Sequence, residues 1–185
     1  RDWEQVPGIS SGLAEHIKAN LDIGRGRKII KWAGENGFKP VTVADDDYPA
    51  SLREIYDRPP YLFFKGDLIA ADSRAVAIVG SRSATDYGRS MAARIAGDLS
   101  RHGVTVVSGM AIGIDSTAHR AALEAGGRTV AVLGSGIDVI YPSSNKKLYH
   151  RIAEQGAVVS EFLPGTDPSP GHFPRRNRII AGLSQ

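Results

Sequence analysis

Four short aliphatic runs, separated by segments of helical period, follow one another along most of this chain. The runs are residues 76–79, 104–107, 129–133 and 157–159. Apolar residues recur three or four positions apart from Met91 to Leu99 and again from Ile114 to Ala125. Strands that alternate with helices form right-handed βαβ crossovers in a parallel sheet. The pattern therefore predicts an α/β domain over residues 46–185, a Rossmann-like parallel sheet with helices on both faces.

Residues 1–45 predict a separate, small helical domain, because Leu13, Ile17 and Leu21 recur at a spacing of four. Residues 6–10 (Val-Pro-Gly-Ile-Ser) resemble the hairpin of helix-hairpin-helix DNA binders, although an ordinary helix-helix turn fits the same letters. Residues 45–72 are rich in proline, tyrosine and acids, and we interpret them as a connector with one short strand over 61–64.

The composition excludes several classes of protein. The chain has 185 residues, of which 42% are hydrophobic and 23% charged, enough for one sizeable core and a small module. No apolar stretch reaches the roughly 18 residues of a membrane span, so we expect no membrane association. The absence of cysteine excludes disulfides and thiolate metal sites and fits a cytoplasmic protein. With a formal net charge of only +3, affinity for a polyanion must come from local clusters of cations.

Each of the first three predicted strands ends in a glycine turn. The first turn is Gly80-Ser81-Arg82, and the next two contain Gly109 and Gly134. The carboxyl ends of parallel strands share one edge, so we expect the turns to lie together. Glycine permits close backbone approach, and the helix N-termini that follow offer amide donors to an anion. One such turn can equally need glycine to reverse the chain, but three together favour a binding edge.

We predict no cofactor at this edge. The dinucleotide fingerprint needs three spaced glycines after the first strand, and residues 80–85 contain only one. A Walker loop needs Gly-Lys followed by serine or threonine, which no segment has. NAD and ATP are therefore not expected.

A cluster of basic residues follows the fourth run. Pro174 suits the first turn of a helix, which would place Arg175 and Arg178 on one face with Arg176 and Asn177 beside them. Three guanidinium groups so arranged can hold several phosphates.

A second cluster follows the third run and opens another helix at Lys146 and Lys147, with Ser144 or Asn145 as its cap. Basic runs are usually solvated helix faces. The convergence of both clusters with Arg82 on one edge nevertheless indicates a phosphate-binding groove.

Catalytic interpretations are weaker. Asp115 and His119 lie four residues apart and could form a hydrolytic trio with Ser108 or Ser116, but a helix-capping aspartate and a structural histidine explain the same pattern. Glu161 is a lone carboxylate for which the sequence suggests no partner. We therefore predict that the chain is not an enzyme.

These residues resemble the DNA-processing protein A family (DprA, also called Smf). The resemblance runs from about residue 45 to the end, and its most specific motif is residues 173–184, Phe-Pro-Arg-Arg-Asn-Arg-Ile-Ile-Ala-Gly-Leu-Ser. It implies a bacterial, cytoplasmic, homodimeric protein that binds and protects single-stranded DNA and helps to load the RecA recombinase in natural transformation or recombination. Family members usually continue beyond this motif, so the resemblance also implies that their C-terminal part is missing here. The DNA-binding residues expected from motif and resemblance together are Gly80, Ser81, Arg82, Gly109, Gly134, Asn145, Lys146, Lys147, Phe173, Arg175, Arg176, Asn177 and Arg178.

Two other functions stay open. The first is a nucleoside-monophosphate phosphoribohydrolase similar to the LOG family, whose Pro-Gly-Gly-x-Gly-Thr loop is only partly matched by Pro164-Gly165-Thr166. The second is a small-ligand sensor that holds a mononucleotide at the glycine edge. The helical start resembles the sterile-alpha-motif-like (SAM-like) domain of the DprA family.

Overall fold

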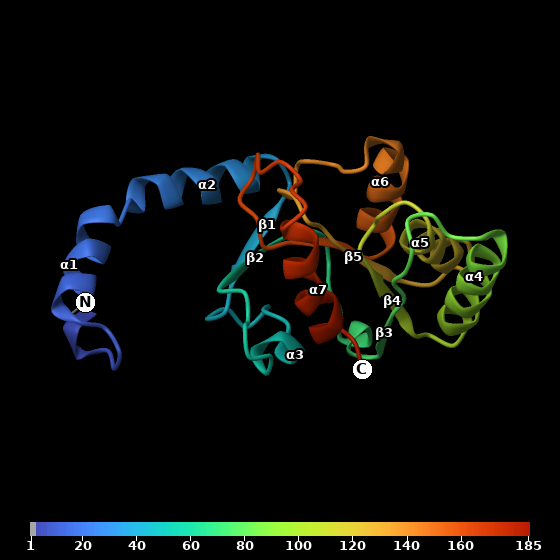
Figure 1. Cartoon of the computed structure of the whole chain (residues 1–185), viewed down its shortest axis with the longest axis horizontal. Coiled ribbons are helices and arrows are strands. Elements are labelled where there is room, and N and C mark those ends of the chain that lie inside the picture. Colours follow the sequence, from blue (N-terminus) through green and yellow to red (C-terminus); the bar gives the residue numbers. More distant parts are fainter. Residues whose placement is uncertain (1–2) are drawn as a thin grey trace. The chain divides into compact units, whose positions relative to one another are not determined.

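A six-stranded mixed sheet organises the larger part of the chain (Figure 1). In the computed structural model, which describes residues 3–185, the strand order is β1-β2-β6-β5-β4-β3. The strands are β1 (Lys39–Thr42), β2 (Tyr61–Gly66), β3 (Ala75–Ala77), β4 (Thr105–Ser108), β5 (Thr129–Val132) and β6 (Ala157–Ser160). Strands β3 to β6 are parallel, whereas β2 is antiparallel to both β1 and β6. The Rossmann-like prediction is confirmed, with two antiparallel strands added on the β6 side.

Helices cover both faces of this sheet. On one face lie α4 (Asp86–Arg101) and α5 (Ile114–Glu124), whose alanines pack on Val106. On the other, α7 (His172–Gly182) and the short α3 (Ala50–Arg53) pack on Val107. Successive side chains of a strand point to opposite faces, so Val106 and Val107 pack into the hydrophobic cores on opposite sides of the sheet. Helix α6 (Lys146–Gln155), which follows the 3-10 turn η3 (Ser143–Asn145), contacts β6, β5 and β2.

Local sequence explains where the helices begin. Thr85 caps α4 by accepting a hydrogen bond from the Gly88 amide at 3.1 Å. Pro174 lies in the first turn of α7, as the sequence predicts, where its missing amide costs no helical hydrogen bond. A short 3-10 turn, η2 (Ala70–Ser73), leads into β3.

Residues expected to be a connector belong to the sheet. The strand predicted over 61–64 is β2, and it pairs with β6 from Phe63 opposite Ser160 to Gly66 opposite Ala157. β1 lies at the sheet edge, where Pro40 is tolerated because an edge strand has amide positions without partners.

The chain divides into two units, Arg1–Trp32 and Ala33–Gln185. This division falls earlier than the predicted boundary at 45/46, and β1 joins the sheet. The smaller unit holds the 3-10 turn η1 (Trp3–Gln5), α1 (Ser11–Asn20) and most of α2 (Ile23–Glu35). Ser10 caps α1 by accepting from the Leu13 amide at 3.3 Å, after Gly8 at a φ of +89°. The likenesses to a helix-hairpin-helix turn and to a SAM-like domain stay predictions.

No helix among residues 3–185 combines the length and apolarity needed to cross a membrane.

Candidate functional site

The loops that follow the parallel strands meet at one edge of the sheet. β3 leads to Arg82, β4 to Gly109, β5 to Gly134 and β6 to Glu161, and ligands of open α/β sheets bind at such an edge. Because β2 runs antiparallel to β6, its first residue and the loop before it lie at this edge too.

The glycines of these turns make room for the protein's own side chains. A Cβ at Gly134 would lie 2.8 Å from the Phe173 ring, and one at Gly109 would lie 2.1 Å from the Arg176 guanidinium. A Cβ at Gly80 would lie 2.7 Å from the Ile114 side chain. These glycines were expected to let a ligand approach the backbone. In the structure, α7 and α5 fill that space.

Arg176 is buried, with a relative exposure of 5%. Its Nη1 donates to the Gly109 carbonyl at 2.7 Å and to the Val132 carbonyl, and its Nε donates to the Asn177 side chain at 3.0 Å. Its Nη2 lies 4.0 Å from a carboxylate oxygen of buried Asp115. The sequence predicts that Arg176 binds DNA. In the structure its guanidinium instead connects α7 to the ends of β4 and β5.

Asn145 is buried as well, at 2% exposure. Its Nδ2 donates to the Met110 carbonyl at 2.9 Å, and its Oδ1 accepts from Arg120 at 3.2 Å. It occupies the N-cap position of α6, but its side chain does not cap that helix. Asn145 instead fixes the loop after β4, in which Met110 has a positive φ of 58°.

Asp115 and His119 make structural contacts. Asp115 Oδ1 accepts from the Gly80 amide at 3.3 Å, and burial raises the pKa of this carboxyl despite Arg176. The cap position of α5 belongs to Gly113, not to Asp115. His119 Nδ1 lies 2.6 Å from Thr129 Oγ1. Burial lowers the pKa of His119 to about 3, and Arg176 and Arg120 act in the same sense.

The two serines proposed for a hydrolytic trio do not face His119. Ser108 donates to the Ile78 carbonyl at 2.6 Å, and Ser116 donates to the Gly113 carbonyl at 3.3 Å. Among the described residues, His119 Nε2 has no hydrogen-bond partner. A nucleophile-base pair is therefore not formed here.

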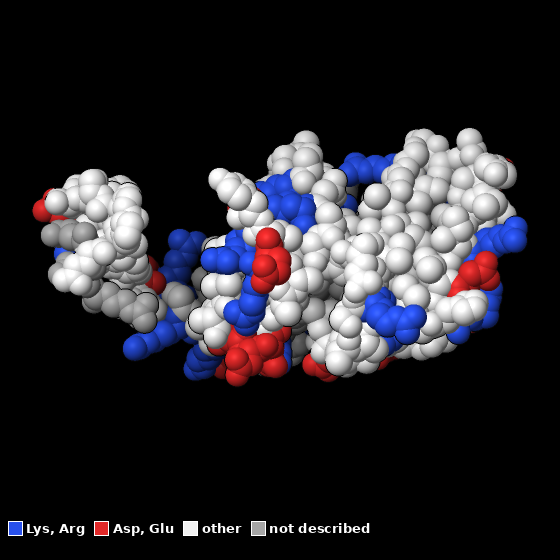
Figure 2. All heavy atoms as spheres, turned by 90° about the horizontal axis from the view of Figure 1, so that it is seen from below, with Lys and Arg blue, Asp and Glu red and all other residues white. Residues whose placement is uncertain are grey.

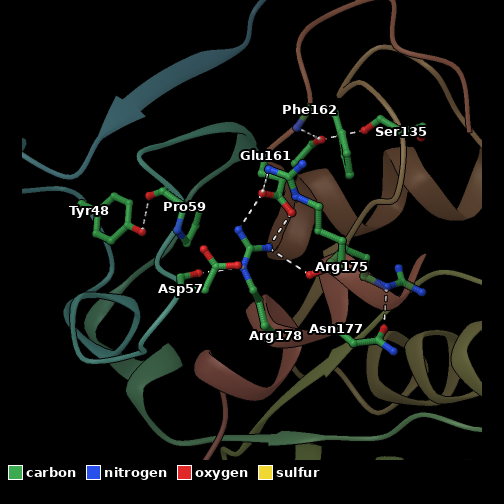
Figure 3. Close-up of polar contacts among 11 residues, drawn as sticks. Tyr48, Asp57, Pro59, Ser135, Glu161, Phe162, Arg175, Asn177 and Arg178 are labelled. Atoms are coloured by element: carbon green, nitrogen blue, oxygen red, sulfur yellow. Dashed lines mark hydrogen bonds and ion pairs between the residues drawn. The ribbon is translucent and has the colours of Figure 1, made fainter. Parts of the chain in front are cut away.

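Glu161, for which the sequence offered no partner, is held by two arginines of α7 (Figure 3). Its carboxylate, only 2% exposed, accepts from Arg178 Nη1 and Nη2 at 2.6 and 2.7 Å. Arg175 Nη2 lies 3.3 Å from the same carboxylate. Arg178 also donates Nε to the Asp57 carbonyl at 2.7 Å, so it is bound on two sides. As predicted, Arg175 and Arg178 lie on one helix face, but Arg178 is engaged within the protein.

An exposed arginine and two aromatic rings form the open part of the edge. The Arg82 guanidinium lies 4.6 Å from the centroid of the Phe173 ring, and Tyr141 lies 6.0 Å from that ring. These three residues line a hollow of about 460 Å³, together with Pro168, Ser169, Pro170 and Pro174. Tyr141 is not among the DNA-binding residues expected from the sequence. Its position after β5, on the binding edge, is the signal that marks it as a site residue.

Three other exposed cations follow strands β5 and β6 in the chain. Arg175 keeps 60% of its side chain exposed and lies 5.8 Å from the centroid of Phe162. Lys146 and Lys147 are exposed at the start of α6. Figure 2 shows Lys and Arg mixed with Asp and Glu over this face of the larger unit. The face therefore carries small groups of cations and no continuous positive surface. Cations beside aromatic rings suit a ligand that has both phosphates and flat rings.

The residues that the structure describes contain no group of three or more histidine, aspartate and glutamate side chains placed to hold a metal ion.

Comparison with known proteins identifies the family. Residues 39–185 match the family described as DNA recombination-mediator protein A. The chain belongs to this family. It is 46% identical to Protein Smf of Synechocystis sp., over 99% of this chain and 55% of Smf. It is 47% identical to the DNA processing protein DprA of Streptococcus pneumoniae, over 79% of this chain and 51% of that protein. The chain therefore spans about half the length of these curated relatives.

Solved structures of DprA proteins share the fold. The S. pneumoniae structure superposes with a TM-score of 0.82 at 40% identity and covers 95% of this chain and 60% of that one. The structure of Helicobacter pylori DNA processing protein A has a TM-score of 0.71 at 31% identity, covering 80% and 66%. That H. pylori protein binds single-stranded DNA, in a mode described as unique. The likeness to the DprA family inferred from the sequence motifs is confirmed.

Proposed function

We propose that this chain binds single-stranded DNA along the edge where the parallel strands end. The observation that carries the proposal is the exposed Arg82 guanidinium stacked on Phe173 at the mouth of the hollow. Non-specific single-strand binders combine a cationic groove with aromatic rings on which bases stack. The family membership and the single-stranded DNA binding of the H. pylori protein support the same ligand.

The site residues expected from the sequence divide into two groups in this proposal. Arg82, Lys146, Lys147 and Arg175 contact phosphates, because they are exposed. Phe173 and Tyr141 offer rings to bases. The remaining residues hold these groups in place from behind or beside the groove: Gly80, Ser81, Gly109, Gly134, Asn145, Arg176, Asn177 and Arg178.

The wider role follows from the family and belongs to the same proposal. A single-strand binder of this family would protect the strand and present it to the RecA recombinase, and it would act as a homodimer. The phosphoribohydrolase alternative gains no support, because the carboxylate at this edge, Glu161, is bound by two arginines.

We expect Arg82→Ala to weaken oligothymidine binding by roughly 10- to 100-fold, the usual contribution of a charged hydrogen bond. Losing one phosphate contact should also flatten the log-log dependence of affinity on salt by about 0.7. Fluorescence anisotropy of a labelled oligonucleotide at several salt concentrations measures both quantities. The loss should be similar for oligothymidine and oligocytidine, because phosphate contacts carry no sequence information.

The matched control is Arg94→Ala. Arg94 is an exposed arginine of α4 that lies 4.0 Å from Asp98, and its removal should leave affinity and salt slope unchanged. Undetectable or salt-independent binding by the unmodified chain would overturn the proposed function. If both variants lost affinity equally, Arg82 would contribute only through the net charge of the protein and not through a specific phosphate contact.

A further inference from the structure

The loop over residues 54–60 lies at the binding edge and connects α3 to β2. Because β2 is antiparallel to β6, the start of β2 lies beside the end of β6, where Glu161 is located. The sequence predicts a connector over residues 45–72, which includes this loop. The sheet topology instead brings this loop to the edge at which Glu161 and Arg178 lie.

Four contacts anchor this loop. The Asp57 carbonyl accepts a hydrogen bond from Arg178 Nε at 2.7 Å, and its carboxylate forms an ion pair with the same Nε at 3.0 Å (Figure 3). The buried Tyr48 hydroxyl donates to the Pro59 carbonyl at 2.7 Å, and Arg58 Nη1 donates to the Arg53 carbonyl at 3.1 Å. The loop is therefore fixed to α7, to the core and to α3.

Tyr56, in the middle of this anchored loop, is fully exposed, with a relative accessibility of 106%. Its side chain makes no hydrogen bond, ion pair or ring contact with any residue in the described range 3–185. Its neighbour Ile55, by contrast, packs against the core. The fold thus presents a large aromatic ring to solvent from a backbone that is held on both sides.

Two arginine–aromatic pairs lie at the same edge of the sheet, although Phe162 in the second pair is buried and stacks on His172 with ring centroids 4.2 Å apart. Arg82 lies over Phe173, Arg175 lies over Phe162, and exposed Arg58 follows Tyr56 in the chain. Arg175 and the loop are linked through Arg178, which donates to the Arg175 carbonyl at 2.9 Å and to the Asp57 carbonyl at 2.7 Å.

We propose that Tyr56 is a base-stacking platform at the far end of the single-stranded DNA path, an inference that rests on the proposed function. The contact is to a base and not to a phosphate, because Tyr56 is followed by the exposed carboxylate of Asp57. Four inter-strand steps of about 4.8 Å separate β3 from β2, which makes a path of about 19 Å. At the 3.4 Å per nucleotide of a stacked strand, this length corresponds to about six nucleotides.

The test uses an oligothymidine of about twelve nucleotides, twice that span. Tyr56→Ala should weaken its binding roughly 5- to 10-fold, the lower end of what one stacked base contributes. The salt slope should not change, because no phosphate contact is lost. Tyr56→Phe should bind like the unmodified chain, since the ring is retained. With 5-iodouracil in the oligonucleotide, photo-crosslinking followed by peptide mass spectrometry should label Tyr56.

The control is Ile95→Ala, which removes an exposed apolar side chain in the middle of α4 (46% exposed), and should leave affinity unchanged. Tyr56→Ala removes no packed contact, so its thermal unfolding should match that of the unmodified chain. If Arg82→Ala weakens binding while Tyr56→Ala does not and no crosslink forms at Tyr56, the platform is wrong and the proposed function stands. If the unmodified chain does not bind the oligonucleotide, both proposals fail.

Discussion

We expect Arg176→Met to lower the free energy of unfolding by about 3–5 kcal/mol, the usual cost of removing one partner of a buried ion pair. The substitution leaves Asp115 buried without its cation. It also leaves the Gly109 and Val132 carbonyls without a donor, and each buried unsatisfied group adds to the cost. Urea unfolding followed by circular dichroism measures the change, provided that the m-value is unaltered.

Two variants show whether the guanidinium acts through charge or through geometry. Arg176→Lys keeps the charge but cannot reach both carbonyls and Asn177 with a fork, so it should lose about half of the stability that Arg176→Met loses. Arg178→Met removes a half-buried arginine whose Glu161 partner retains Arg175, and it should cost less. A loss below about 1 kcal/mol for Arg176→Met would contradict the structural role of this residue.

We expect the stability of the chain to fall as the pH decreases from about 6.5, because His119 is buried in its neutral form. Its pKa is about 3 in the folded state and 6.5 in the unfolded chain, so between these limits the unfolded state binds a proton that the folded state does not. The stability from this group is complete above pH 6.5 and is lost as the pH falls towards 3. From about pH 6 to about pH 4 the loss is on the order of 2 kcal/mol.

His119→Asn is the control for this pH dependence. The amide of asparagine can still donate to Thr129 Oγ1, but it does not titrate, so the variant should lack this part of the slope. Asp115 shifts the dependence in the opposite direction, since burial raises its pKa. The difference between the two proteins therefore isolates His119. Parallel stability curves for both proteins across about pH 4–6 would show that folding does not lower the pKa of His119.

The sequence predicts the parallel strands and β2, but it does not predict β1. Strands β4, β5 and β6 are buried on both faces, so they appear as aliphatic runs between helical segments. β1 is four residues long and contains Pro40, which argues against a strand unless it lies at an edge. Its pairing with β2 depends on tertiary contacts that no local pattern shows.

The sequence does not show which of the predicted site residues are buried and which are exposed. Arg175, Arg176 and Arg178 are equally hydrophilic, so hydropathy cannot say which one points inward. Arg176 is the one that points inward because Gly109 has no side chain and leaves room for its guanidinium. Glu161, likewise, acquires its partners only when α7 packs beside β6.

The place of α7 in the chain also bears on when the edge can form during synthesis. Arg176 donates to the Gly109 and Val132 carbonyls, and Phe173 packs against Gly134. The loops after β4 and β5 therefore gain these contacts only after α7, which is translated later, has been made. Contacts of such sequence separation form slowly. A nascent chain that has not yet released α7 from the ribosome therefore lacks both the ring under Arg82 and the cation beside Asp115. The contacts of Phe173 with Arg82 and of Arg176 with Asp115 form only once this helix has docked.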